Sequence, residues 1–383
     1  MELKKAWIGS SLPESDDFWV LLPELIIKEN FHRVDPKLHR QFKEIYFIEN
    51  NLADFITWPI ILDELLRLVN GKAKIFIKIR TSSPYFSIAT FNKKVYSYVC
   101  GKVKLLTFEI VDSSILLSFE IEKDLNILDN NWTFGIVWDG KNKSYLEKFI
   151  DSVHMQNVSV KYEIIICGPE TDLQNSKNCI FVTPDELVEK LSNISIKKNL
   201  IVENANYSNI CIVHNRYQLE DNFIESFEQF GLDYDVAIIK QHMESGQRVP
   251  DWITQGSNFI FTQNYLMEYD DYSPYQYVGG GMMIAKKDTL IKHKWNSLGV
   301  WNSGEDIDLS ERLRNAGIQV RFNPFSKAIV LSLRKGILED FKPLPIKNII
   351  EAKYDVFSND YSKIGIKEII FKFARYIKLR LLK

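Results

Sequence analysis

The chain has 383 residues, with 45% hydrophobic and 26% charged residues and a formal net charge of −2. This composition excludes a disordered, collagen-like or disulfide-scaffold protein, and the length suggests about two or three domains. A near-neutral chain has no electrostatic reason to bind nucleic acid, so no such partner is expected. Four scattered cysteines without a CxxC pair, and the absence of a signal segment or a long apolar run, favour a reduced, cytoplasmic protein.

The first part of the chain has the pattern of a small α/β domain. Strands are predicted over Glu44–Ile48 and Lys74–Ile79, and a helix over Trp58–Val69, where apolar residues repeat at helical spacing. Two further strand-like runs, Leu105–Val111 and Ile115–Ile121, flank a short polar turn. This arrangement predicts a hairpin.

The helix, turn and strand of Leu62–Ile77, together with the hairpin, resemble the later part of a class I methyltransferase. The resemblance implies a Rossmann-like domain over residues 1–125. The glycine-rich turn that would admit the sulfonium cofactor is missing, because Ala6–Ser10 holds a single glycine. We therefore expect a degenerate, scaffolding domain that binds no S-adenosylmethionine, rather than an active methyltransferase.

Strands and helices alternate after the polar stretch Glu122–Asn131, which marks a domain boundary. Strands are predicted over Thr133–Val137, Tyr162–Cys167, Ile180–Thr183 and Ile210–Val213, and helices over Tyr145–Val153 and Asp221–Gly231. This order predicts a mostly parallel central sheet with helices on both sides. Ligands of such sheets bind beyond the carboxyl ends of the strands.

Polar residues follow three of these strands. Asp139 follows the first, Glu170 the second, and His214, Asn215 and Arg216 the last. In a parallel sheet all of them would meet at one crevice, which favours a ligand site. The alternative is that polar residues simply end strands.

The strand, helix, strand and acidic turn of Phe134–Asp172 resemble the start of a family 2 glycosyltransferase of the GT-A fold. The resemblance implies that Asp139 and Glu170 hold the nucleotide of a nucleotide-sugar donor. Lys198 and Asn199, in a Lys-Lys-Asn cluster, resemble the basic helix start of that family and offer donors for diphosphate or uracil. An exposed charged turn is the alternative.

This family carries an Asp-x-Asp motif after the strand that here ends in His214, Asn215 and Arg216. The motif implies a divalent cation, Mg²⁺ or Mn²⁺, that neutralises the leaving diphosphate. His214 and Asn215 can ligate a metal but bring no negative charge, so metal use stays open. Arg216 can contact the diphosphate directly. For His214, a hydrogen-bonded position at the end of a core strand is the alternative.

The run Val278–Ala285 contains three successive glycines, and Glu305-Asp306 follows about twenty residues later at the start of a predicted helix. This order and spacing resemble those of family 2 enzymes. Gly280 and Gly281 have no side chains, so we expect their backbone to approach the donor sugar closely.

The resemblance makes Asp306 the general base that takes the proton of the acceptor hydroxyl, with Glu305 as the alternate. A capping box that starts at Ser303 is the structural alternative, since acidic residues are favoured in a first helical turn. Nearby, the aromatic-rich stretch Trp252–Tyr277 can line an acceptor cleft by stacking on sugar rings, or pack under a long loop.

The C-terminal residues 341–383 are predicted to form a helical, basic tail. Within Ile364–Lys383, basic and apolar residues repeat at helical spacing, as in helices that bind membrane surfaces. Such a tail would bring the protein to a lipid-linked glycan at the inner face of the membrane. A helix packed on the domain is the alternative.

The predicted fold class is α/β, with a GT-A nucleotide-diphospho-sugar transferase domain over residues 131–340 and a smaller N-terminal Rossmann-like domain. The resemblance implies an inverting glycosyltransferase of surface polysaccharide biosynthesis. Its donor would be a UDP-sugar or another nucleotide sugar, and its acceptor a glycan or lipid-linked glycan. A non-catalytic scaffold that binds glycan or nucleotide sugar is the alternative, favoured by the missing Asp-x-Asp.

Overall fold

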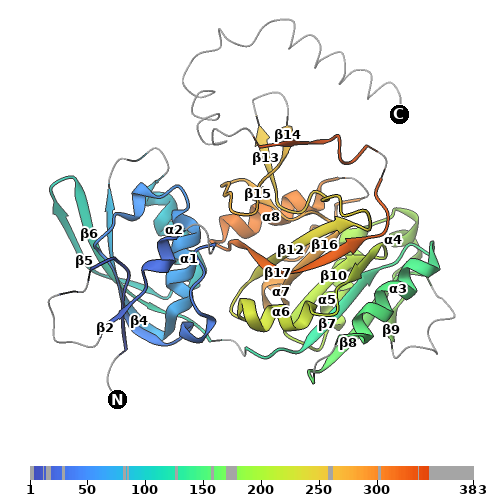
Figure 1. Cartoon of the computed structure of the whole chain (residues 1–383), viewed down its shortest axis with the longest axis horizontal. Coiled ribbons are helices and arrows are strands. Elements are labelled where there is room, and N and C mark those ends of the chain that lie inside the picture. The colour runs from blue at the N-terminus through green and yellow to red at the C-terminus, as the bar shows by residue number, and fades with distance from the viewer. Residues whose placement is uncertain are drawn as a thin grey trace, which may run out of the picture.

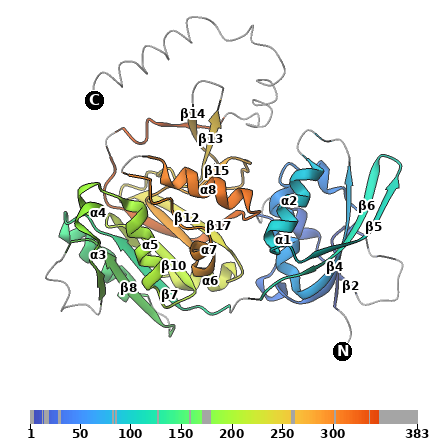
Figure 2. The ribbon, with the colours of Figure 1, turned by 180° about the vertical axis from the view of Figure 1, so that it is seen from behind.

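The computed structural model describes residues 4–11, 13, 19–27, 31–80, 83, 86–125, 128–156, 159–169, 179–257, 262–300, 303–334 and 336–344. They form two α/β bodies side by side, a smaller N-terminal one and a larger one (Figures 1 and 2). Among these residues, no helix is long and apolar enough to cross a membrane.

The N-terminal body is built on a six-stranded sheet of order β2-β1-β3-β4-β6-β5. Its strands are β1 (Lys5–Trp7), β2 (Trp19–Leu21), β3 (Phe42–Phe47), β4 (Val69–Arg80), β5 (Val103–Val111) and β6 (Ser114–Glu122), and its helices are α1 (Trp58–Leu68) and α2 (Ile88–Tyr98). The strands from β2 to β4 pair in parallel, and β6 and β5 close the sheet as an antiparallel hairpin. The predicted helix and hairpin are confirmed, and β4 starts earlier than predicted.

The larger body contains an eight-stranded sheet of order β11-β17-β12-β16-β10-β7-β8-β9. Its strands are β7 (Trp132–Val137), β8 (Tyr162–Cys167), β9 (Cys179–Val182), β10 (Asn209–His214), β11 (Tyr217–Leu219), β12 (Val236–Met243), β16 (Met282–Lys286) and β17 (Val320–Val330). The neighbours β10, β7, β8 and β9 pair in parallel, as predicted, whereas β16 runs antiparallel between β10 and β12.

Helices cover both faces of this sheet (Figure 1). They are α3 (Lys143–His154), α4 (Glu186–Lys190), α5 (Ile194–Asn204), α6 (Phe223–Phe230), α7 (Lys287–Lys292) and α8 (Glu305–Asn315). Side chains of β7 alternate between the two cores: Trp132 and Phe134 pack with α3 and α6, and Val137 packs with α5. Gly135 lets α5 lie close, because a Cβ there would come within 2.4 Å of Ile201.

A third, four-stranded sheet has the order β15-β13-β14-β18. Its strands are β13 (Ile253–Ser257), β14 (Thr262–Leu266), β15 (Gln276–Tyr277) and β18 (Phe341–Pro343). The predicted helical tail therefore begins with a strand, because the backbone of residues 341–343 pairs with β14. The rest of the tail, residues 345–383, lies outside the described residues.

The two bodies meet through buried ion pairs along α1. Arg67 contacts Asp63 at 2.8 Å and Asp233 of the larger body at 3.0 Å. Arg321 of β17 contacts Asp63 at 2.8 Å and Glu64 at 2.9 Å. Buried charges are costly unless they are paired, so this network holds the two bodies in one arrangement.

Candidate functional site

The carboxyl ends of β7, β8 and β10 lie side by side. His214 is opposite Val137 in the sheet, and Val137 is opposite Cys167. The predicted convergence of the strand ends is therefore confirmed for the loops that start at Asp139 and His214. Glu170, the predicted acidic residue after β8, lies outside the described residues.

Asp139 and Asn215 meet at the rim of this crevice through the backbone of Lys141. The Oδ1 atom of Asp139 accepts a hydrogen bond from the backbone N–H of Lys141 at 3.0 Å. The Nδ2 atom of Asn215 donates to the carbonyl oxygen of Lys141, also at 3.0 Å. Asp139 remains exposed and can still bind a ligand, whereas the amide of Asn215 ties the two loops together.

The Lys-Lys-Asn cluster is buried within α5, so the alternative of an exposed charged turn is wrong. Lys197 donates to the carbonyl oxygen of Trp138 at 2.8 Å and contacts Glu189 at 2.7 Å. Asn199 bonds the backbone of Trp295 with both ends of its amide, at 2.9 and 3.0 Å. The predicted donor-binding role of Asn199 is corrected to a structural one, because its amide is already engaged.

Lys198 is the cation that joins the crevice to the acidic pair. It is only 1% exposed, and its Nζ atom donates to the carbonyl oxygen of Gly280 at 2.9 Å and to Oε1 of Glu305 at 3.2 Å. The same ammonium lies 5.4 Å from the ring centroid of Trp295. Glu305 is therefore neutralised by a buried partner.

Asp306 lies beside Glu305 and is held from two directions. One carboxylate oxygen accepts the backbone N–H of Gly280 at 2.9 Å, and the other accepts the N–H of Ile307 at 2.9 Å. Burial and the charge of Glu305 raise the pKa of Asp306, against the opposing effects of Lys198 and these two N–H groups. An oriented carboxylate with a raised pKa, still partly open to solvent, is suited to accept a proton.

The capping-box alternative for this acidic pair is wrong. The N-cap of α8 is Gly304, in a left-handed conformation with φ of 74°, and no side chain caps the helix. Ser303 instead donates to the carbonyl oxygen of Val300 at 2.6 Å. The position of Asp306 is therefore not explained by capping.

The glycines just before β16 make room for side chains of the protein itself. A Cβ on Gly280 would lie 2.7 Å from Oε1 of Glu305 and 3.3 Å from Oδ2 of Asp306. A Cβ on Gly281 would clash with the hydroxyl of Tyr217. The carboxylates of Glu305 and Asp306 therefore lie close to the backbone of Gly280, and the approach of these glycines to a sugar stays a prediction.

His214 lies in a positively charged environment. Burial lowers the pKa of His214 well below its usual value, and Lys198, Arg216 and Lys197 lower it further. The imidazole is therefore neutral at pH 7. Lys197 and Lys198 are balanced by Glu189 and Glu305, whereas Arg216 adds positive charge beside His214, which favours an anion over a divalent metal ion.

No group of three His, Cys, Asp or Glu side chains that could hold a metal ion occurs in the part of the chain that the structure describes. The predicted metal ligands His214 and Asn215 therefore belong to no such group among the described residues. Metal use remains a prediction from the family resemblance.

Several buried polar atoms around the crevice have no hydrogen-bond partner among the described residues. They are Nε1 of Trp138, Oε1 of Glu189, Oγ of Ser195, Nε2 of His214, Nε of Arg216 and Nε1 of Trp295. Buried polar groups are nearly always hydrogen-bonded, so a cluster of unpaired ones indicates a place for a polar ligand. Sequence reasoning assigned no site role to Trp138, Ser195 or Trp295. The fold brings Trp138 to Lys197 and Trp295 to Lys198, whereas Ser195 lies two residues before Lys197 in α5.

Comparisons with known proteins give structural matches of low similarity. No protein-family model matches the chain, and no curated protein matches it. Among the solved structures that match is one of S. aureus TarS 1–349, with 14% identity, a TM-score of 0.38 and coverage of 62% of this chain and 76% of that one. A second structure of S. aureus TarS has 13% identity, a TM-score of 0.37 and coverage of 55% and 38%. Identity this low says nothing of substrate, so function rests on the geometry of the site.

Proposed function

We propose that this chain is an inverting glycosyltransferase that moves a sugar from a nucleotide-sugar donor to a glycan acceptor. One observation supports this most directly: a cationic crevice with unpaired donors lies next to a carboxylate with a raised pKa. The crevice suits the diphosphate of the donor. The carboxylate, Asp306, suits the activation of an acceptor hydroxyl.

The diphosphate would lie against Arg216 and the indole N–H groups of Trp138 and Trp295. These groups are the unpaired donors of the crevice. Fixed donors and positive charges stabilise the negative charge that grows on a leaving group without having to reorganise. Asp139, at the edge of the site, would contact the nucleoside of the donor. The sequence assigns the same nucleotide-binding role to Glu170.

The chemical step follows from the position of Asp306. The acceptor hydroxyl oxygen forms a bond to the anomeric carbon while the bond from that carbon to the diphosphate oxygen breaks. The electron pair of the broken bond stays on the diphosphate, and the hydroxyl proton passes to Asp306. Glu305 keeps Lys198 in place and, by its own charge, helps to raise the pKa of Asp306.

A divalent cation is implied by the family resemblance, but the described residues around His214 do not fit one. We therefore assign the neutralisation of diphosphate charge to Arg216 and Lys198. The neutral imidazole of His214 would donate a hydrogen bond from its protonated ring nitrogen to an oxygen of the diphosphate.

The donor would be a UDP-sugar or another nucleotide sugar, and the acceptor a surface polysaccharide or lipid-linked glycan. These assignments rest on the family resemblance. The basic, apolar pattern of residues 364–383 supports a position at the inner face of the membrane.

The proposal is tested by nucleotide release from a panel of UDP-sugars, with wild type, Asp306→Asn and Asp308→Asn. Asp308 is a matched control, because it lies in the same helical turn and, within the described part of the chain, forms its ion pair with Arg312, at 2.9 Å. Asp306→Asn should lower kcat by about 10²–10⁴-fold and leave donor affinity within a few-fold, since a base acts in the transition state. Equal activity of wild type and Asp306→Asn would refute the assignment.

The non-catalytic scaffold is the second candidate, favoured by the missing Asp-x-Asp motif. It predicts that nucleotide sugars raise the melting temperature of wild type, as any ligand of the native state does, without nucleotide release. Release by wild type that depends on Asp306 would exclude it.

A further inference from the structure

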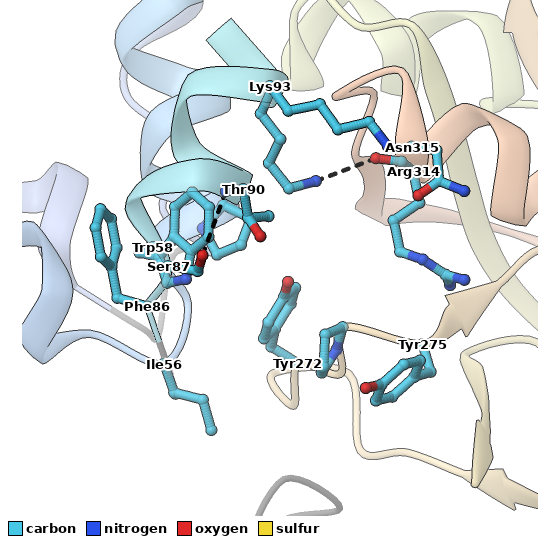
Figure 3. A pocket seen from close by; sticks show the side chains of 13 residues that line it. Ile56, Trp58, Phe86, Ser87, Thr90, Lys93, Tyr272, Tyr275, Arg314 and Asn315 are labelled. Carbon is cyan, nitrogen blue, oxygen red and sulfur yellow. Dashed lines mark hydrogen bonds between the residues drawn. The ribbon is translucent and has the colours of Figure 1, made fainter. Parts of the chain in front are cut away.

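A cavity of about 380 Å³ opens where the two bodies meet (Figure 3). The N-terminal body contributes Trp58 and the start of α2, and the larger body contributes Tyr272, Tyr275 and the last turn of α8. The aromatic stretch 252–277 was expected either to line a cleft or to pack under a loop, and its residues do both. Trp252 and Tyr269 pack on Phe322, whereas Tyr272 and Tyr275 face the cavity.

The cavity is positively charged. Its described lining includes Lys93, Lys94 and Arg314 and no acidic residue. The described residues form no ion pair within 4.0 Å with any of these three side chains. Lys94 donates to the carbonyl oxygen of Arg314 at 3.1 Å, and burial together with the charge of Arg314 lowers its pKa to about 8.

Aromatic rings line the same space. Trp58 and Phe86 pack edge to face, with centroids 5.0 Å apart, on the side of the N-terminal body. On the opposite side, the guanidinium of Arg314 lies 5.6 Å from the ring centroid of Tyr275. Aromatic faces stack on sugar rings, while Lys and Arg bind phosphate or carboxylate. A ligand with both a ring and a negative charge therefore fits.

The cavity lies within reach of the reaction site along one helix. Asp306 is in the first turn of α8 and Arg314 is in its last turn, eight residues further, or about 12 Å at the helical rise. A glycan whose end lies at Asp306 can therefore extend to the cavity within a few sugar units.

We propose that this cavity binds an anionic sugar unit, carrying phosphate or carboxylate, of the acceptor glycan, away from its reacting end. Its assignment to the acceptor rests on the proposed function, whereas the affinity of the cavity for anionic sugars does not. Arg314 and Lys93 would contact the charge, and Tyr272 and Tyr275 would contact the ring.

The test is calorimetric titration of the full chain with glucose 6-phosphate, glucuronate, glucose and inorganic phosphate at constant ionic strength. Glucose 6-phosphate or glucuronate should bind, and whichever binds more tightly identifies the charged group. Lys93→Gln/Arg314→Gln should weaken that binding by about tenfold or more, because each cation removed is a charge-assisted partner. Lys327→Gln/Arg334→Gln removes the same charge from exposed ion pairs elsewhere and should leave binding unchanged.

Two results would overturn the proposal. One is binding of inorganic phosphate as tight as that of both sugar anions, which would show a simple anion site. The other is binding that survives in the Lys93→Gln/Arg314→Gln protein and disappears in Arg216→Gln, which would place the ligand in the donor crevice. Nucleotide release by wild type, measured in parallel, reports the proposed function separately, so failure of either idea is recognised independently.

Discussion

Replacing Arg321 by Met should destabilise the protein, because it removes a positive charge that two buried carboxylates contact at the junction of the two bodies. Arg321 is 2% exposed and contacts Asp63 at 2.8 Å and Glu64 at 2.9 Å. Breaking a buried pair on one side costs about 3–5 kcal/mol, because a buried charge loses its partner. Here Asp63 keeps Arg67 and Glu64 keeps Arg33, so we expect about 3 kcal/mol, near the lower end of that range.

The pH dependence of this loss identifies its cause. Burial alone would raise the pKa of Glu64, but Arg33, Arg321 and His39 hold it well below the ordinary value of 4.5. A carboxylate with a lowered pKa stabilises the fold above its unfolded pKa, and that stability is lost as pH falls through the folded pKa. The difference between wild type and Arg321→Met should therefore be full at pH 7 and shrink below pH 4.5.

Urea unfolding of the full chain, followed by circular dichroism from pH 7 to pH 4, measures both effects. Arg334→Met is the control, since the Arg334–Asp340 pair is half exposed and such pairs contribute about 0–1 kcal/mol. A loss below about 1 kcal/mol at pH 7 for Arg321→Met, equal to that of the control, would refute the buried network. A loss that stays constant with pH would show that packing, and not charge, explains it.

Three further predictions concern the candidate site and one concerns the tail. Gly280→Ala should lower kcat, because the added Cβ would lie only 2.7 Å from Oε1 of Glu305 and would push that carboxylate away. A lower kcat in steady-state kinetics, with an unchanged melting temperature, would support this. The kcat should fall in acid with an apparent pKa above 3.8, the ordinary value for an aspartate such as Asp306. Glu305→Gln should lower that apparent pKa, because the charge of Glu305 helps to raise it. A pH–rate profile that Glu305→Gln leaves unchanged would contradict this coupling of the two carboxylates. A metal chelator should change the affinity for the donor by no more than a few-fold, whereas Arg216→Gln should weaken that affinity about tenfold or more. Complete loss of donor binding in chelator, restored by Mn²⁺, would show instead that a metal ion holds the diphosphate. Removal of residues 364–383 should abolish co-sedimentation with anionic vesicles, since each Lys or Arg contributes roughly 1 kcal/mol there, and a lower melting temperature without a change in vesicle binding would favour a packed helix.

Local patterns were enough to predict much of the fold. The helical spacing in Trp58–Val69 and the alternation of strand and helix after Trp132 predicted α1 and the parallel strands correctly. The parallel order also brought Asp139 and His214 to one edge, because that consequence follows from connectivity alone.

Features that depend on distant parts of the chain could not be predicted in this way. The apolar spacing of α1 carried no information on its charged residues, and the fold shows Asp63, Glu64 and Arg67 buried where α1 meets the larger body. Asn199 suggested a ligand contact, and only the fold shows its amide on the backbone of Trp295. The methyltransferase resemblance of the first 125 residues, and any role of Glu170, remain predictions from the sequence.

Helix α8 fixes the distance between its two ends. It carries Asp306 at one end and Arg314 at the other, and an α-helix does not stretch. If the acceptor binds as proposed, the number of residues between Asp306 and Arg314 would set the distance between its reacting hydroxyl and its charged group. Inserting one residue in α8 would rotate Arg314 by about 100°, away from the cavity, whereas inserting four would lengthen the span by about 6 Å and nearly restore its direction. Under the proposed function, the spacing of charges in the acceptor would therefore follow from the length of this one helix.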